Sequence, residues 1–174
     1  MADVVGPGLR VLFCGVNPGL RSAELGQHFA RPGNRFWKVL HAAGFTDRVL
    51  APGEQGLLPA FGLGITNLVD RPTAGAAELT VAQLREGAAR LVVKAADLRP
   101  GVVAVLGVVA YRKAFTRPRA VMGAQQDRLG DAAMWVLPNP SGLQARYQLA
   151  EMTELFAGLR RAAGMRPAHA GARA

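Results

Sequence analysis

The stretch L-F-C-G-V-N-P-G, residues 12–19, decides the fold of this chain. Its apolar start predicts a strand that is buried on both faces, and the glycines and the proline that follow end the strand abruptly. In a parallel sheet such a break lies at the carboxyl edge, where open α/β folds place their ligands. The polar side chain at this break is Asn17.

A second stretch has the same form. In W-V-L-P-N-P-S-G-L, residues 135–143, an apolar strand again runs into an Asn-Pro turn, here at Asn139. Because both turns follow predicted strands, we expect one cleft built from the two loops.

Strands and helices alternate along the rest of the chain. Apolar runs predict strands at 10–14, 63–69, 102–106 and 134–137, and helical periodicity predicts helices at 34–44, 54–60, 80–97, 107–115 and 148–163. We expect residues 21–33 to form a loop over the cleft and the polar, basic residues 117–131 to be a surface excursion. The pattern predicts an α/β sandwich around a mostly parallel four-stranded sheet.

Length and composition indicate a single domain over residues 1–174, with a frayed tail from about 164. No export signal and no apolar run of membrane-spanning length is visible, so we expect a cytoplasmic protein with no membrane partner. Cys14 is the single cysteine, which excludes an internal disulfide, a Cys-rich zinc site and a four-cysteine iron–sulfur cluster. We expect its side chain to be buried in the first strand.

The charge is strongly basic. Lys plus Arg number 21 against 12 for Asp plus Glu, which gives a net charge of +9 and a pI near 11.2. This excess favours a polyanionic partner, above all nucleic acid, although a basic surface without a partner is the alternative.

The sequence lacks the motifs of nucleotide-binding, metal and serine-nucleophile sites. The chain has neither a phosphate-binding loop nor a G-x-G-x-x-G turn, so we expect no nucleotide cofactor. The three histidines show no metal-ligand spacing, and we expect His28 to be a solvated loop residue. Ser141 does not lie in a G-x-S-x-G elbow, which argues against a serine nucleophile.

The remaining polar groups suit recognition of a base and activation of water. An asparagine amide is both a donor and an acceptor, so it can read a nucleobase edge or hold a water, but it is not a general base. The alternative for Asn17 and Asn139 is a turn residue that bonds its own backbone. Asp70 follows the second predicted strand, and its carboxylate could stabilise a sugar cation and take a proton from water. Its alternative role is to pair with Arg71 or to cap the turn.

The motifs G-V-N-P-G (15–19) and N-P-S-G-L (139–143) resemble those of the mismatch-specific uracil/thymine-DNA glycosylases, the second family of the uracil-DNA glycosylase superfamily. The stretches A-R-P-G-N-R-F-W-K-V-L, A-G-F-T-D-R and L-V-D-R-P-T extend the resemblance over most of the chain. It implies a three-layer α/β/α sandwich and a monofunctional glycosylase without cofactor or metal. The substrate would be uracil, mainly opposite guanine in double-stranded DNA, with thymine and exocyclic cytosine adducts as further substrates.

The resemblance also assigns roles to residues. Asn17 would orient the attacking water, and Phe29 would stack on the flipped base. The base-binding set is Gly15, Val16, Phe29 and Asn139; the DNA-contacting wedge is Ser141, Gly142, Leu143 and Arg146. Beyond the resemblance, we expect Asp70 to be at least a partner of Asn17 in activating water.

Two adjacent positions depart from the family. Residues 144–145 are Gln-Ala where the bacterial family commonly has Ser-Arg, so we expect a broader substrate range than strict guanine mismatches. The first rival interpretation is a non-catalytic binder of mismatched or abasic DNA, and the second is a small-molecule hydrolase. We expect the protein to act as a monomer that associates with the nucleoid when bound to DNA.

Overall fold

The protein is described by a computed structural model that covers residues 1–142 and 146–171. Its sheet has the order β2-β1-β3-β5-β4. The strands are β1 (Val11–Gly15), β2 (Leu63–Asn67), β3 (Val102–Leu106), β4 (Gly123–Leu129) and β5 (Ala132–Leu137). The helices are α1 (Leu20–Leu25), α2 (Phe36–Ala42), α3 (Val81–Leu98), α4 (Val108–Ala114) and α5 (Leu149–Ala162), with 3₁₀ turns η1 (Pro52–Phe61), η2 (Ala76–Glu78) and η3 (Ala168–Gly171).

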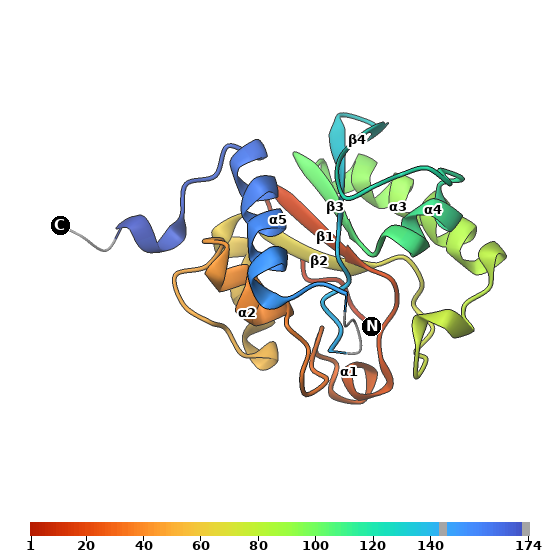
Figure 1. The fold of residues 1–174 in the computed structure, drawn as a ribbon, viewed down its shortest axis with the longest axis horizontal. Coiled ribbons are helices and arrows are strands. Elements are labelled where there is room, and N and C mark those ends of the chain that lie inside the picture. The colour runs from red at the N-terminus through yellow and green to blue at the C-terminus, as the bar shows by residue number, and fades with distance from the viewer. Residues whose placement is uncertain (143–145, 172–174) are drawn as a thin grey trace.

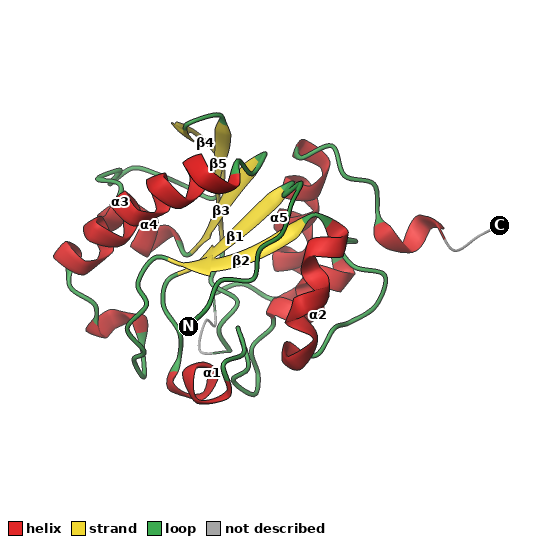
Figure 2. Ribbon diagram, turned by 180° about the vertical axis from the view of Figure 1, so that it is seen from behind, coloured by secondary structure: helices red, strands yellow, loops and turns green. Residues whose placement is uncertain are grey.

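Helices cover both faces of the sheet, with α3 and α4 on one side and α2 and α5 on the other (Figures 1 and 2). Successive residues of β1 point to opposite faces, so Phe13 packs in the cluster of α2 and α5 while Leu12 packs in the cluster of α3 and α4. The Phe13 ring lies 5.5 Å from that of Phe36 and 5.9 Å from that of Phe156, measured between centroids. The three-layer α/β/α sandwich is therefore confirmed.

The strand register aligns the ends of the parallel strands. Gly15 at the end of β1 is the partner of Asn67 at the end of β2, and Leu106 of β3 is the partner of Leu137 of β5. The four parallel strands β1, β2, β3 and β5 thus end at one edge of the sheet, and the loops that follow them emerge side by side. In Figure 2 this is the edge at which α1 and the long loops gather.

The sheet has five strands, and the expectation of four was wrong. The additional strand β4 lies within the segment predicted as a surface excursion and pairs antiparallel with β5 at the sheet edge. Its first six residues alternate between intermediate and exposed while Leu129 is buried, and its polar sequence gave no strand signal. Asp127 anchors β4, because it accepts hydrogen bonds from the hydroxyl of Tyr111 at 2.9 Å and from Arg117 at 2.7 Å.

Most predicted helix boundaries are close to those observed. Thr80 caps α3 by accepting a hydrogen bond from the Gln83 backbone at 3.2 Å, and the Gln83 side chain accepts one from the Thr80 backbone at 2.9 Å. The loop predicted at 21–33 differs, since it opens with the short helix α1.

The start of the C-terminal tail is not frayed, contrary to expectation. The Ala168 backbone donates a hydrogen bond to the Gly44 carbonyl at 2.8 Å, and Arg160 of α5 donates to the carbonyls of Ala43 and Met165. The residues that follow α5 are thus packed against the end of α2. Among residues 1–142 and 146–171, no helix combines the length and apolar composition that crossing a membrane requires.

Candidate functional site

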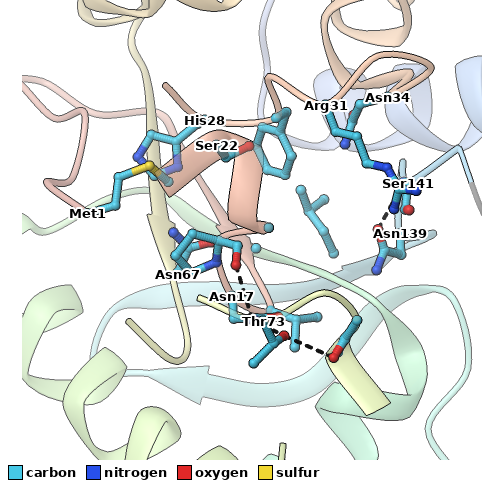
Figure 3. Close-up of a pocket in the computed structure, with 18 of the residues that line it drawn as sticks. Met1, Asn17, Ser22, His28, Arg31, Asn34, Asn67, Thr73, Asn139 and Ser141 are labelled. Carbon is cyan, nitrogen blue, oxygen red and sulfur yellow. Dashed lines mark hydrogen bonds between the residues drawn. The ribbon is translucent and has the colours of Figure 1, made fainter. Parts of the chain in front are cut away.

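A cavity of about 290 Å³ opens at the carboxyl edge of the sheet, where the loops of several strands converge (Figure 3). Its walls come from the turn after β1, the loop before α2, the end of β2, the turn 73–76 and the loop after β5. Of the residues predicted from sequence, it is lined by Gly15, Val16, Asn17, Phe29, Asn139 and Ser141. The two Asn-Pro loops therefore contribute to one cleft, as expected.

The side chain of Asn17 is held in one orientation. Its Nδ2 donates to the Thr73 hydroxyl at 2.7 Å and to the Arg71 carbonyl at 3.0 Å, and the Thr73 hydroxyl in turn donates to the Gly75 carbonyl at 2.9 Å. Carbonyl partners only accept, which assigns the amide nitrogen to this side. Within the described part of the chain, no group donates to Asn17 Oδ1. The amide oxygen is therefore available as an acceptor.

Asn67 is a candidate site residue that the sequence analysis missed. It ends β2, is only 7% exposed and lines the cavity. A Cβ on Gly15 would lie 2.5 Å from Asn67 Oδ1, so this glycine is required for the amide to lie across the end of β1. The described residues provide no hydrogen bond to the Asn67 amide. The available signal was that Asn67 is a polar residue at the end of a strand. The predicted strand ran on to residue 69, so Asn67 was placed inside the strand and not at its end.

Phe29 forms an aromatic wall of the cavity. Its ring stacks on Phe36, with centroids 4.1 Å apart and an interplanar angle of 26°. Its backbone has a φ of 55°, which is rare for a residue with a side chain and is maintained only where neighbours hold it. One such contact is the hydrogen bond from Trp37 Nε1 to the carbonyl of residue 28 at 3.2 Å. The ring is therefore fixed before any ligand arrives.

His28 is buried, so its assignment as a solvated loop residue was wrong. It is 1% exposed, and its Nε2 lies 2.9 Å from the Ala2 carbonyl. Burial is the main cause that lowers its pKa below the ordinary value of 6.5. The neutral ring is thus favoured, and it packs between the N-terminal segment and the loop of Phe29.

The loop after β5 combines a turn with a close backbone contact. Asn139 Oδ1 accepts a hydrogen bond from the Ser141 backbone at 3.0 Å, which is the turn geometry left open as an alternative role. A Cβ on Gly142 would lie 2.7 Å from the Gly33 carbonyl oxygen, so the loop packs directly on the segment before α2. Leu143 lies outside the described residues. Arg146 is exposed, with its guanidinium carbon 5.9 Å from the centroid of the Tyr147 ring.

Asp70 lies apart from this cavity. β1 and β2 are neighbours, as its prediction required, but Asp70 is exposed and is absent from the cavity lining among the described residues. In the same part of the chain it has neither an ion pair nor a hydrogen bond, so pairing with Arg71 is not observed either. The chain turns after Asp70 so that the Arg71 carbonyl and Thr73 contact Asn17 instead.

The cavity has a basic rim and no acidic lining. Arg31 lines it, and Arg71 and Arg146 are exposed on adjoining loops. Among the described residues, no Asp or Glu lines the cavity and no group of three or more His, Cys, Asp or Glu is placed to hold a metal ion. The side-chain chemistry available here is that of amides, hydroxyls, an imidazole, a guanidinium and an aromatic ring.

The fold is an α/β/α sandwich with a cavity at the carboxyl edge of its sheet, the place where such folds hold their ligands. Residues 2–160 match the sequence model of the uracil DNA glycosylase superfamily, and the chain belongs to this superfamily of glycosylase hydrolases that act on DNA. The structure is also similar to the solution NMR structure of a candidate uracil DNA glycosylase from Methanosarcina acetivorans. That match has a TM-score of 0.61 and 18% identity over 91% of this chain and 96% of the other, and it supports the fold.

Proposed function

We propose that this protein hydrolyses the N-glycosidic bond of uracil in double-stranded DNA, mainly opposite guanine, and so starts base excision repair. Thymine and exocyclic cytosine adducts opposite guanine are the proposed further substrates. The observation that carries the proposal is the oriented amide of Asn17 in a cavity with a fixed phenyl wall. Membership of the superfamily supports the reaction class, while the mismatch preference rests on the resemblance of the two Asn-Pro motifs.

The cavity offers separate groups for the face and for the edge of a base. The Phe29 ring provides a stacking surface, and aromatic stacking suits any planar base. The buried amide of Asn67 supplies a donor and an acceptor, and backbone groups near Val16 and Phe29 would complete the polar contacts. An amide in such a pocket loses water when a base binds, so it discriminates against bases whose edge cannot replace those hydrogen bonds.

Hydrolysis requires a water held on the sugar side of the base. Asn17 Oδ1 would accept a hydrogen bond from this water, while Thr73 keeps the amide from turning. The water oxygen forms the new bond to the sugar carbon, the electron pair of the N-glycosidic bond leaves with the base, and the water proton passes to solvent or to the base. Because Asn17 is no base, its contribution is positioning, and leaving-group stabilisation by the base pocket carries much of the barrier.

A base can enter this cavity only if its nucleotide leaves the DNA duplex. Extrusion costs a few kcal/mol and less at a mismatch, which gives selectivity before any contact in the pocket. Ser141, Gly142, Leu143 and Arg146 form the loop that we propose to contact the vacated stack and the opposite guanine. The basic rim would hold the DNA backbone.

The test is a duplex with one uracil opposite guanine, incubated with the protein and then treated with alkali to cut any abasic site. We expect cleavage at the uracil position, greatly reduced for Asn17→Ala. The reaction before alkali should leave the strand intact. An intact strand after alkali, with a folded protein in excess over DNA, would rule out the proposed activity.

A non-catalytic binder of mismatched or abasic DNA is the second candidate. It is favoured by one observation, that no carboxylate lines the cavity among the described residues. The same assay separates the two candidates, because a binder would retain mismatched DNA in a gel shift without producing alkali-sensitive sites.

A further inference from the structure

The N-terminal segment, residues 1–4, is attached along the outer edge of β2. The Val4 backbone donates to the Ile65 carbonyl at 2.9 Å, and the Ile65 backbone donates to the Val4 carbonyl at 2.8 Å, in an antiparallel bridge. A Cβ on Gly64 would lie 2.9 Å from the Val4 carbonyl oxygen, so the two backbones are in close contact. Because the segment runs antiparallel to β2, its beginning reaches the carboxyl edge of the sheet.

Side chains from three other elements hold the segment in place. Asp3 forms an ion pair with Lys94 of α3 at 2.8 Å, and its carboxylate accepts a hydrogen bond from Thr66 of β2 at 2.7 Å. The Ala2 carbonyl lies 2.9 Å from Nε2 of the buried His28. The two partners of the Asp3 carboxylate also contact each other, because Lys94 donates a hydrogen bond to the Thr66 hydroxyl at 2.9 Å. Such a network fixes the segment better than one exposed pair would.

This attachment places Met1 in the wall of the cavity. Met1 is one of the lining residues, and Figure 3 shows it on the side of Asn67 and His28, across the cavity from Asn139. The methionine side chain is apolar and adaptable, so it fills space and offers no more than the weakly accepting thioether sulfur. Its thioether chain therefore limits the room beside the Asn67 amide without competing for that amide.

We propose that residues 1–4 are a specificity-determining element of the cavity, in which Met1 limits the size of the base accepted beside Asn67. This inference rests on the proposed glycosylase function. Uracil is the smallest of the proposed substrates. Thymine carries an additional methyl group, and ethenocytosine, an exocyclic cytosine adduct, carries an additional two-carbon bridge. Removing the Met1 side chain enlarges the cavity, which favours the larger bases relative to uracil.

The direct test is Met1→Gly, made by cleaving a removable leader so that glycine stands at position 1. Single-turnover rates are measured on uracil, thymine and ethenocytosine opposite guanine. We expect the ratio of ethenocytosine to uracil excision to rise about tenfold, the scale on which apolar pockets discriminate small size differences. The substitution removes no core side chain, so folding should be unaffected.

A second variant, Asp3→Asn, weakens the attachment and leaves Met1 in place. We expect faster hydrogen exchange of the Ile65 amide, which donates to the Val4 carbonyl, together with a smaller rise of the same ratio. Asp97→Asn, at an exposed position of the same helix as Lys94, is the matched control and should change neither quantity.

The outcomes are distinct. An unchanged ratio in Met1→Gly, or a parallel fall on all three substrates, would overturn the inference and leave the segment a purely structural one. Faster exchange in Asp3→Asn without any change of the ratio would overturn it as well. Failure of the wild-type protein to excise uracil would instead remove the proposed function, and the inference with it.

Discussion

The Thr73 hydroxyl accepts a hydrogen bond from the side-chain amide of Asn17 at 2.7 Å and thereby leaves the Asn17 carbonyl oxygen available as an acceptor in the cavity. The hydroxyl proton is already engaged by the Gly75 carbonyl at 2.9 Å, so Thr73 acts towards Asn17 as an acceptor. The two residues lie 56 positions apart in sequence and meet because β1 and β2 are adjacent in the sheet.

Replacing Thr73 by valine should slow excision without weakening DNA binding. Valine retains the shape of threonine but removes the shortest hydrogen bond of Asn17 Nδ2. The amide then has only the longer bonds to the Arg71 and Pro18 carbonyls, at 3.0 and 3.2 Å, so the water position becomes less defined. We expect a loss of about tenfold to a hundredfold in the single-turnover rate, which corresponds to about 1.4 to 2.7 kcal/mol. Thr73→Ser keeps the hydroxyl and should restore most of the rate. Equal rates for Thr73→Val and wild type would show that this hydrogen bond has no part in catalysis.

The paired substitutions Asn17→Ala and Asp70→Asn decide which residue activates water. The sequence analysis made Asp70 at least a partner of Asn17, whereas the exposed position of Asp70 outside the cavity lining favours Asn17 alone. We expect Asn17→Ala to lose about a hundredfold to a thousandfold in rate, the scale for removing one preorganised polar group, and Asp70→Asn to stay close to wild type. Folding is checked by thermal unfolding. A comparable loss in well-folded Asp70→Asn would reinstate the catalytic carboxylate.

DNA binding should weaken as salt rises. Arginines that contact phosphates release counterions, so the logarithm of the association constant should fall linearly with the logarithm of salt concentration. Arg146→Gln should reduce this slope, since Arg146 is exposed beside the proposed DNA-contacting loop. Arg85→Gln, at an exposed position of α3, is the control. Fluorescence anisotropy with a labelled duplex gives the slope, and a flat dependence would contradict a phosphate-binding surface.

The contact of α3 with the end of β2 should be sensitive to one methyl group. A Cβ on Gly87 would lie 2.2 Å from the Leu68 carbonyl oxygen, so Gly87→Ala forces the helix away from the sheet. We expect the free energy of unfolding to fall by about 1 to 3 kcal/mol in urea titrations. Gly158→Ala in α5 is the matched control, because the nearest atom to its Cβ would be Arg161 Nη2 at 3.9 Å. That variant should be neutral or stabilised by up to about 1 kcal/mol.

Stability should fall as the pH drops below about 6.5, the ordinary pKa of histidine. Burial lowers the pKa of His28 in the folded protein, so the unfolded chain binds a proton at a higher pH than the folded one does. The contribution of neutral His28 to the free energy of unfolding is complete above the pKa of the unfolded state. It decreases as the pH falls from that value to the pKa of the folded state. Urea unfolding at pH 7.5 and 5.5 measures the change. His28→Asn should reduce the difference in the free energy of unfolding between the two pH values.

The sequence by itself determined where the main strands and helices break. The strand predicted at 102–106 is the strand observed, and Thr80 begins α3 through a capping box that is local in sequence. Asn17 and Asn139 were found because each is a polar residue at the end of an apolar run. Such signals depend on neighbours within a few residues, so a single sequence contains them.

The tertiary structure alone decided which side chains face the cavity. Asn67 lies beside Gly15 because of the register between β1 and β2, and no pattern within either strand specifies that register. Thr73 rather than Asp70 meets Asn17 because the chain turns between them, and Met1 reaches the site only because the first residues pair with Ile65. β4 escaped detection because an edge strand needs no apolar alternation. Strand ends follow from local propensity, whereas the groups that meet across a sheet edge are set by pairings between distant segments.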